Sequence, residues 1–410
     1  MKNQKRQVVS ILAWSLLFFA WGCVDPFPIP TDEGFDNVLI VEGTLTNIES
    51  TQEISLTRTA PLGTAEVVGE QNASVTVRLG NGNSFAFQEV APGRYQSVET
   101  FAATEGNTYT LEVISADGNT YTSTAQTLPP TAPLDEVVAR RIVNDDDIEG
   151  VEIIVNTTDP SGQANFFRYT FEETYKIIAP QWNQFEAFIV SEDPPQVDIR
   201  LRSQEELICF GTNSSQSGTF FETTELSNNE VQEFPVHFLE KDNFFIAHRY
   251  SILIKQEVQS EEAFTFYRKL RELSGQENVF TQQQPGFLTG NILVNGNSTP
   301  EVTGYFEVVS QSERRIFFNF EDFFEPEGLP AFAVGCGEPQ TPSLPADRFG
   351  NSELLNAIRN ESLEFFNDNI GGTGPGGANP DPNAPFKMVP RICGDCTVLG
   401  SNVTPDFWIE

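Results

Sequence analysis

Short runs of β-forming residues, separated by turn residues at close intervals, restrict the fold of residues 37–131 more than any other feature. The runs are rich in Val, Ile, Thr and aromatic residues, several with the period-two alternation of half-buried strands. Gly and Asn stand between them, as in tight turns that need a positive φ. The runs cover residues 38–43, 53–57, 73–78, 84–87, 109–114 and 120–123. About seven short strands at this spacing predict an immunoglobulin-like or transthyretin-like β-sandwich.

The remaining residues, 132–410, predict a larger β-rich domain with one or two short helices, so that the whole chain is mainly β. Residues 151–155 and 166–171 flank a turn and predict a hairpin, and residues 248–255 predict a strand. Apolar residues then recur at helical spacing after the N-cap residue Ser260. They are Phe264, Tyr267, Leu270 and Leu273. A second helix is expected over 352–359, and the Gly/Pro-rich residues 367–386 predict a flexible loop.

An apolar run that ends at Cys23 identifies the N-terminus as a lipoprotein signal. Three basic residues precede the run, and small Ala20 and Gly22 come just before Cys23. At about 14 residues, the run is shorter than the roughly 18 to 20 of a membrane-spanning helix. We therefore predict that residues 1–22 are a cleaved signal peptide, that Cys23 is acylated, and that residues 23–36 form an extended tether. A secreted protein cut after Gly22 and an uncleaved anchor are the alternatives.

The chain is strongly acidic, with 24 Lys and Arg against 58 Asp and Glu and a formal net charge of −34. Nucleic-acid binding depends on basic residues that neutralise phosphates, so this balance argues against a nucleic-acid partner. The acids are scattered along the chain, which favours a role in solubility over an acidic tail. The same field can also attract cations or basic proteins.

Cysteine usage points to disulfide bonds. With Cys23 set aside for acylation, an even number remains, and an exported chain of this kind is expected to form two disulfides. The four are Cys209, Cys336, Cys393 and Cys396. The C-x-x-C spacing of the last two also allows a zinc site or a redox pair. Their place after a Gly/Pro-rich segment near the C-terminus favours disulfides, with the pairing open, and we expect no cofactor.

The low number of histidines limits histidine-based catalysis and metal binding. The sequence contains two histidines, His237 and His248, and we expect both to be packing residues and not ligands. The sequence has no nucleophile elbow, phosphate-binding loop, dinucleotide fingerprint or zinc-protease motif. These observations argue against the common catalytic constellations.

One acidic segment is a candidate metal site. Asp145, Asp147 and Glu149 alternate before Gly150, as at the start of an EF-hand calcium loop. Asn156 occupies the position where such a loop needs a bidentate Glu. A solvated turn is therefore the favoured prediction, and weak calcium binding is the alternative.

Several segments match a known family when they are taken together. They include LIVEGTLTN at 39–47, GNTYTL at 106–111, DGNTYTS at 117–123, RYSILIKQ at 249–256, GNI at 290–292, VTGYF at 302–306 and CGDC at 393–396. These segments resemble the DUF4249 family, a group of cell-envelope lipoproteins of Bacteroidota. The resemblance implies a protein that accompanies TonB-dependent outer-membrane receptors, and it carries over no catalytic residue.

We therefore expect a non-enzymatic outer-membrane lipoprotein, held by its lipid anchor and facing the cell surface in preference to the periplasm. It would capture or present a ligand for a TonB-dependent receptor or stabilise that receptor. A surface adhesion or matrix-binding module is the first alternative, suggested by the N-terminal sandwich. An envelope hydrolase with two carboxyls in a cleft is the second.

Overall fold

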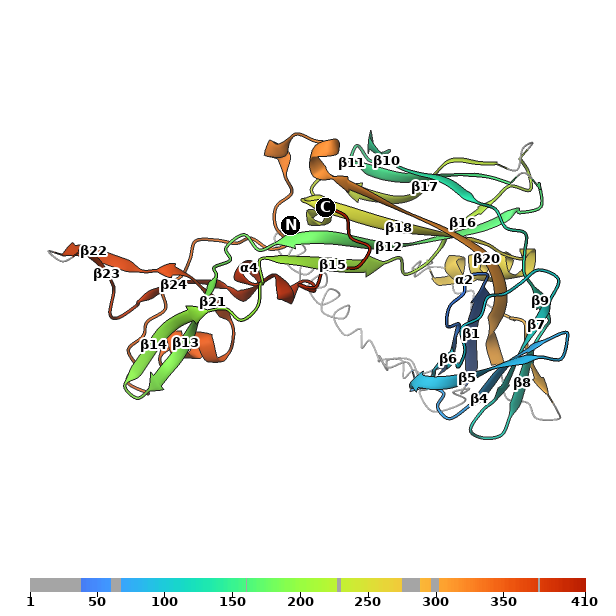
Figure 1. Ribbon diagram of the computed structural model, residues 1–410, viewed down its shortest axis with the longest axis horizontal. Helices are drawn as coiled ribbons and strands as arrows, with labels where there is room; N and C mark the ends of the chain where they lie inside the picture. The colour runs from blue at the N-terminus through green and yellow to red at the C-terminus, as the bar shows by residue number, and fades with distance from the viewer. Residues whose placement is uncertain are drawn as a thin grey trace, which may run out of the picture.

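The computed structural model describes residues 38–59, 68–159, 161–226, 230–274, 288–295, 302–374 and 377–410. These residues are mostly β and form three bodies (Figure 1). Of these described residues, those within 38–127 and 290–309 form the N-terminal sandwich, and those within 132–179, 208–258 and 310–324 form the second sandwich. The arm contains residues 181–206 and 337–396 and points away from both sandwiches. Cys23, the predicted signal peptide and the tether lie outside the described residues.

The N-terminal sandwich is built from short antiparallel strands with alternate residues buried, as the sequence predicts. Its strands are hydrogen-bonded in the order β1, β2, β6, β5, β4, β7, β8. At the predicted turn after β7, Gly118 has a φ of +85°. The bounds are β1 Leu39–Thr46, β2 Glu53–Arg58, β3 Val68–Gly69, β4 Ser74–Leu79, β5 Ser84–Ala91, β6 Arg94–Ser97, β7 Thr108–Ile114, β8 Thr120–Ser123 and β9 Gln126–Thr127.

Two later segments complete this body beyond residue 131. Strand β19 (Ile292–Asn295) pairs antiparallel with β8, and residues 302–309 of the long strand β20 (Val302–Asn319) pair in parallel with β1. Ile292, Phe306 and Val308 belong to the buried core of the N-terminal sandwich. These two strands cover edges that β1 and β8 would otherwise expose.

The second half of β20 belongs to the second sandwich, where residues 310–319 pair antiparallel with β18. The larger sheet runs β15, β12, β18, β20, and β16 also pairs with β12, while β10, β11 and β17 form a separate three-stranded sheet. One apolar core contains residues from both sheets. The bounds are β10 Leu134–Val143, β11 Glu149–Thr158, β12 Phe166–Ile178, β15 Ile208–Ser214, β16 Thr219–Glu222, β17 Glu230–Glu240, η1 Phe244–Ile246, β18 Arg249–Val258, η2 Phe320–Asp322 and η3 Pro326–Gly328.

The predicted hairpin of residues 151–155 with 166–171 is wrong. Both segments form strands, but β11 pairs with β10 and β17, whereas β12 pairs with β15, β16 and β18. The two strands therefore lie in different sheets. Both bury large apolar faces, and each finds its neighbours elsewhere in the chain.

The predicted helix is α2 (Glu261–Ser274), which lies at the junction of the two sandwiches (Figure 1). Its N-cap is confirmed, because the Ser260 hydroxyl accepts a hydrogen bond from the Ala263 amide at 3.2 Å. Phe264 is buried, but Leu270 and Leu273 are 41% and 38% exposed. The apolar stripe is thus buried only near the start of the helix. Among the described residues, no helix is long and apolar enough to cross a membrane.

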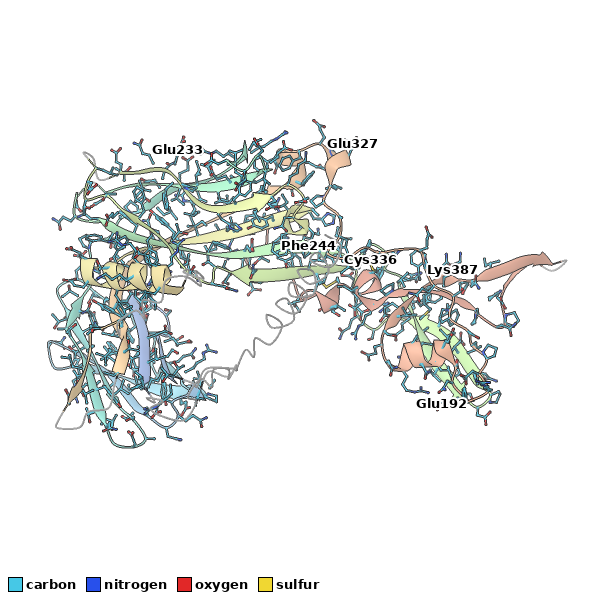
Figure 2. The ribbon with its side chains drawn as sticks, turned by 180° about the vertical axis from the view of Figure 1, so that it is seen from behind. Glu192, Glu233, Phe244, Glu327, Cys336 and Lys387 are labelled. Atoms are coloured by element: carbon cyan, nitrogen blue, oxygen red, sulfur yellow. A yellow bond between two sulfur atoms is a disulfide. The ribbon has the colours of Figure 1, made fainter. Side chains whose placement is uncertain are left out.

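The arm has a small core and two disulfides. Its elements are β13 Phe185–Glu192, β14 Pro195–Leu201, α3 Glu353–Arg359, β21 Leu363–Asp368, β22 Ile370–Gly374, β23 Gly377–Pro380, β24 Phe386–Pro390, α4 Arg391–Gly394 and η4 Cys396–Val398. Helix α3 matches the second predicted helix. The segment 367–386 differs from the predicted structureless loop, because β22 and β23 pair within it. Cys336 lies where the arm meets the second sandwich (Figure 2).

Candidate functional site

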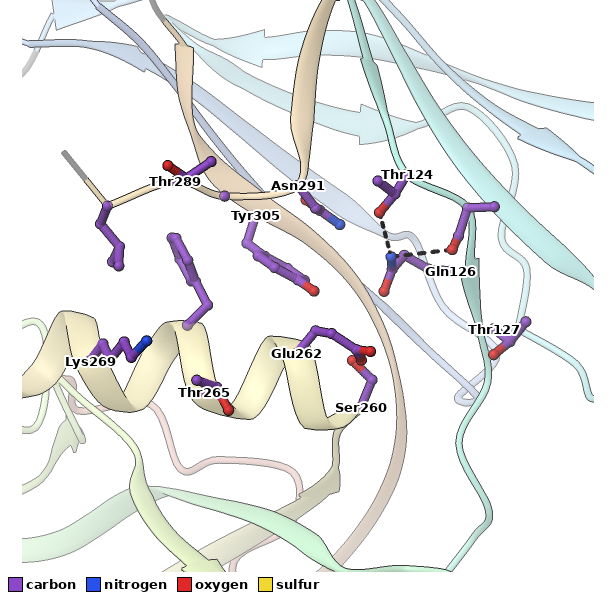
Figure 3. A pocket seen from close by; sticks show the side chains of 14 residues that line it. Thr124, Gln126, Thr127, Ser260, Glu262, Thr265, Lys269, Thr289, Asn291 and Tyr305 are labelled. Carbon is purple, nitrogen blue, oxygen red and sulfur yellow. Dashed lines mark hydrogen bonds between the residues drawn. The ribbon is translucent and has the colours of Figure 1, made fainter.

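A pocket opens where the N-terminal sandwich, α2 and β20 come together (Figure 3). Its volume is about 570 Å³. The lining comes from β9 and the two residues before it, Ser260 and one face of α2, the segment before β19, and Tyr305 of β20. Small-molecule sites are frequently found at such boundaries between bodies. We take this junction pocket as the candidate site.

Close backbone packing builds the wall of the junction pocket. The Asn291 side chain donates to the Phe306 carbonyl at 2.7 Å and accepts from the Phe306 amide at 2.9 Å. The Asn291 side chain therefore pairs with the backbone amide and carbonyl of Phe306, as a neighbouring strand would otherwise do. Gly304 has a φ of +108°, and a Cβ there would lie 2.0 Å from the Val41 carbonyl oxygen. These contacts explain why the segments 290–292 and 302–306 contain Asn and Gly.

Aromatic rings and hydroxyl groups form the floor and rim of the junction pocket. The rings of Phe266 and Tyr305 are 5.0 Å apart, and both residues are buried. Burial raises the pKa of Tyr305 to about 12, so its phenol remains protonated at neutral pH. On the rim, the Gln126 amide donates to the Thr124 hydroxyl at 2.9 Å. The floor is thus apolar, and the rim offers hydrogen-bonding groups.

A buried charged cluster, formed by Arg168, Glu257, Glu307 and Gln259, lies near α2 where the sandwiches meet. The Arg168 guanidinium is 2.5 Å from the Glu257 carboxylate and 2.7 Å from the Glu307 carboxylate. Gln259 donates to the other oxygen of Glu307 at 2.7 Å. The residues come from β12, β18 and β20 and from the segment before α2. The cluster therefore ties the shared strand to the second sandwich and to the start of the helix.

Burial and charge act against each other in this cluster. Burial raises the pKa of Glu307, because its side chain is only 1% exposed. Burial opposes the charge of Arg168, but the carboxylates of Glu307 and Glu257 outweigh that effect and raise its pKa. The guanidinium also lies over the ring of Tyr267, 4.8 Å from its centroid. Because each charge has a close partner, we assign the cluster a structural role at the junction.

The cysteines form two disulfides, as predicted, and the structure decides the pairing. Cys209 of β15 is bonded to Cys396, and Cys336 is bonded to Cys393. The two cysteines of the C-x-x-C motif thus have different partners. This pairing leaves neither a C-x-x-C redox pair nor four free thiolates for zinc. Cys23, the predicted acylation site, lies outside the described residues.

The acidic segment after β10 forms a tight turn, as favoured from the sequence. The Asn144 side chain accepts hydrogen bonds from the amides of Asp146 and Ile148, at 3.0 and 2.9 Å. Glu149 is paired with Arg141 and with Lys241. The described residues contain no group of three or more side chains placed to hold a metal ion. Asp145 and Asp147 lie in this turn, and the Glu149 carboxylate is occupied by the Arg141 and Lys241 side chains.

The two histidines occupy different surroundings. The ring of His237 lies 4.2 Å from that of Phe171, and its Nε2 is 3.4 Å from the Glu173 carboxylate. His248 lies beside Lys176 at a separate hollow of the second sandwich. Burial, with a smaller effect of Lys176, lowers the pKa of His248. Neither lines the junction pocket.

Sequence reasoning missed the junction pocket. Its lining residues come from four separate segments, and none of them carries a catalytic or metal-binding motif. The one signal was the resemblance itself, because the segments 290–292 and 302–306 both contribute to the pocket. Their spacing in the sequence does not indicate that they line one pocket. The fold brings them together.

Comparison with known proteins places the chain in a family but assigns no activity. No curated protein matches it. One structural match is a DUF4785 family protein from Legionella pneumophila, with 9% identity over 53% of this chain and 51% of that chain, and a TM-score of 0.17. The chain thus spans about half of that protein, and the TM-score is too low to support an argument. The family model for a domain of unknown function, DUF4249, matches residues 24–315, more than half of the chain. The chain therefore belongs to the DUF4249 family.

Proposed function

We propose that the protein is a non-enzymatic, lipid-anchored accessory protein of a TonB-dependent receptor in the outer membrane of a Bacteroidota cell. It captures a small ligand at the cell surface and presents it to the receptor. The junction pocket carries this proposal, since it combines an apolar floor with a hydrogen-bonding rim at the boundary of two bodies. The two disulfides support an oxidising compartment outside the cytoplasm.

The anchor in this proposal is Cys23. Two or three acyl chains on one residue bind a membrane far more strongly than a single chain, since each buried methylene contributes about 0.8 kcal/mol. Replacing Cys23 with Ala should therefore move the protein from the membrane fraction to the soluble fraction. Continued membrane fractionation of the Cys23→Ala variant would contradict the anchor. Cys336→Ala is the matched control, because it removes a disulfide cysteine and leaves Cys23 in place.

The receptor partnership is tested by purification from the native envelope. A tagged full-length protein is extracted in mild detergent, and its partners are identified by mass spectrometry. We expect a TonB-dependent receptor to be enriched over a control purification with another tagged outer-membrane lipoprotein. Equal recovery of receptors in both purifications would exclude a specific partnership.

A further inference from the structure

The two charged side chains at the rim of the junction pocket have no partner in the described part of the chain. Glu262 and Lys269 both lie on the face of α2 that lines the pocket (Figure 3). No hydrogen bond or ion pair is formed by either side chain there, and both residues are exposed. Thr265 lies between them on the same face. A ligand that entered the pocket would meet these groups first.

Another face of the same helix is different, because its cations are already engaged. Arg268 is paired with Glu222 at 3.3 Å, and Arg271 donates to the Gly218 carbonyl at 3.1 Å. These contacts bind α2 to β16 and the turn before it. The charges that hold the helix in place are thus separate from those that face the pocket. Glu262 and Lys269 remain available for a ligand.

The spacing of the two free charges sets the length of a complementary ligand. They are seven residues apart, which is two helical turns, or about 10 Å along the helix axis. An extended peptide covers about 3.3 to 3.6 Å per residue, so about three residues fit between them. The apolar residues Phe266, Tyr305 and Leu288 line the same pocket as the two charges. A volume of about 570 Å³ is within the range of small-molecule sites.

The electrostatics favour a ligand without net charge. The pocket lining contains one carboxylate and one ammonium group, whereas the whole chain has a net charge of −34. The long-range field therefore repels anions, while the local pair favours a dipolar molecule. The helix N-terminus carries about half a positive charge, which the carboxylate of Glu262 in the first turn outweighs. That end of the pocket thus favours an ammonium group.

We propose that the junction pocket binds a short zwitterionic peptide of about three residues. The peptide's α-ammonium group pairs with Glu262 and its carboxylate with Lys269. The hydroxyls of Thr265 and Thr289 and the side-chain carbonyl of Gln126 form hydrogen bonds with its backbone, and its side chains contact Phe266 and Leu288. This inference rests on the ligand-capture part of the proposed function and names the class of ligand.

The test is calorimetric titration of the full-length protein in detergent micelles with Ala-Leu-Ala and with its N-acetylated and C-amidated forms. We expect the free peptide to bind, and each blocked form to bind about fivefold more weakly, the scale of one solvent-exposed charge pair. Equal binding of free and blocked peptides would overturn the inference. So would the absence of binding at millimolar peptide, or preferential binding of a neutral trisaccharide.

Two variants assign the ends of the peptide. Glu262→Gln should weaken the free peptide about fivefold and abolish the effect of N-acetylation, while the effect of C-amidation remains. Lys269→Gln should show the reverse pattern. Glu261→Gln, at the neighbouring position outside the pocket lining, is the control and should leave all three affinities unchanged. Identical effects of Glu261→Gln and Glu262→Gln would contradict the assignment.

The outcome is independent of the receptor. The titration contains no receptor, so the expected peptide pattern would stand even if no TonB-dependent receptor co-purified. In that case the receptor part of the proposed function would fail alone. Conversely, a co-purifying receptor without peptide binding would leave the partnership intact and refute the ligand class.

Discussion

The second sandwich and the arm differ most in the size of their apolar cores. Among the described residues, 25 buried residues form the core of the second sandwich, whereas four form that of the arm. Two of the four disulfide-bonded cysteines, Cys393 and Cys396, lie in the arm and Cys336 lies at its base, and the bond from Cys209 to Cys396 attaches the arm to the second sandwich. A small body cannot bury enough apolar surface to fold by packing alone. The comparison indicates that packing holds the sandwich and that covalent bonds hold the arm.

Buried carboxylates show the same difference. In the second sandwich, Glu173 accepts hydrogen bonds from Tyr250 at 2.5 Å and Asn213 at 2.9 Å. Burial alone would raise the pKa of Glu173, but these bonds and the nearby His237 outweigh it and lower the pKa. In the arm, burial raises the pKa of Glu206 and Glu364, and the attraction of Arg202 only partly offsets it. The partners of Glu173 therefore compensate for its burial better than Arg202 does for Glu206 and Glu364.

Removing a core ring from the second sandwich should have the largest effect. Phe167 is 0% exposed, and Phe167→Ala should destabilise the protein by about 3 to 5 kcal/mol, because it removes apolar contacts and leaves a cavity. Phe349→Ala is the control, since Phe349 is 73% exposed and its loss should change stability by less than about 0.5 kcal/mol. Urea unfolding measures both. A similar loss for the two variants would contradict the assignment of packing to the sandwich.

Removing the disulfide between the two bodies should come next. The double variant Cys209→Ala with Cys396→Ala should destabilise the arm by about 2 to 4 kcal/mol, because a long closed loop is released. Hydrogen exchange followed by mass spectrometry should show faster exchange in β21 and β24 and little change in β4 and β7. Equal acceleration in all four strands would show that the bond stabilises the whole molecule and not the arm.

A smaller effect is expected from Glu173→Gln. Loss of hydrogen bonds to a charged group should destabilise the second sandwich by about 1.5 to 3 kcal/mol at pH 7. The pKa of Glu173 in the folded protein is below its ordinary value of 4.5. Its stabilising effect is therefore present above that value and is lost as the pH falls through the lowered pKa. Urea unfolding at pH 7 and below pH 4.5 measures how much stability is lost in acid. The loss should be smaller for Glu173→Gln than for the unchanged protein, and an equal loss would refute this role.

The smallest effect is expected from Glu364→Gln in the arm. Arg202 keeps Glu206 as a partner, and the raised pKa means that burial of the Glu364 charge costs more than Arg202 returns, so the variant should be more stable at pH 7 by about 0.5 to 1 kcal/mol. The raised pKa of Glu364 gives the opposite pH dependence to Glu173. Its contribution favours the folded arm below the ordinary value of 4.5 and is lost as the pH rises through the raised pKa. Hydrogen exchange of β21, corrected for intrinsic rates, should show greater protection in acid than at neutral pH. Equal loss of protection in acid in the arm and in the second sandwich would contradict the difference between Glu364 and Glu173.

The amino-acid sequence by itself determined most of the local structure. Strand runs, the turn at Gly118 and the N-cap at Ser260 all depend on neighbouring residues, and the structure has them where they were predicted. The mainly β class and the formation of two disulfides also followed from composition and pattern. Local propensity and periodicity act over a few residues, and they can be recognised without a partner.

Only the tertiary structure decided which strands and side chains become neighbours. Residues 302–309 of β20 pair with β1 across more than 250 residues, and β11 and β12 separate into two sheets. The disulfide pairing and the meeting of Glu262, Lys269 and Tyr305 at one pocket depend on these contacts. A strand pattern states which face is buried, but it does not name the strand beside it, because many strands present equivalent backbone groups. The pocket therefore exists only once the shared strand has joined the two sandwiches.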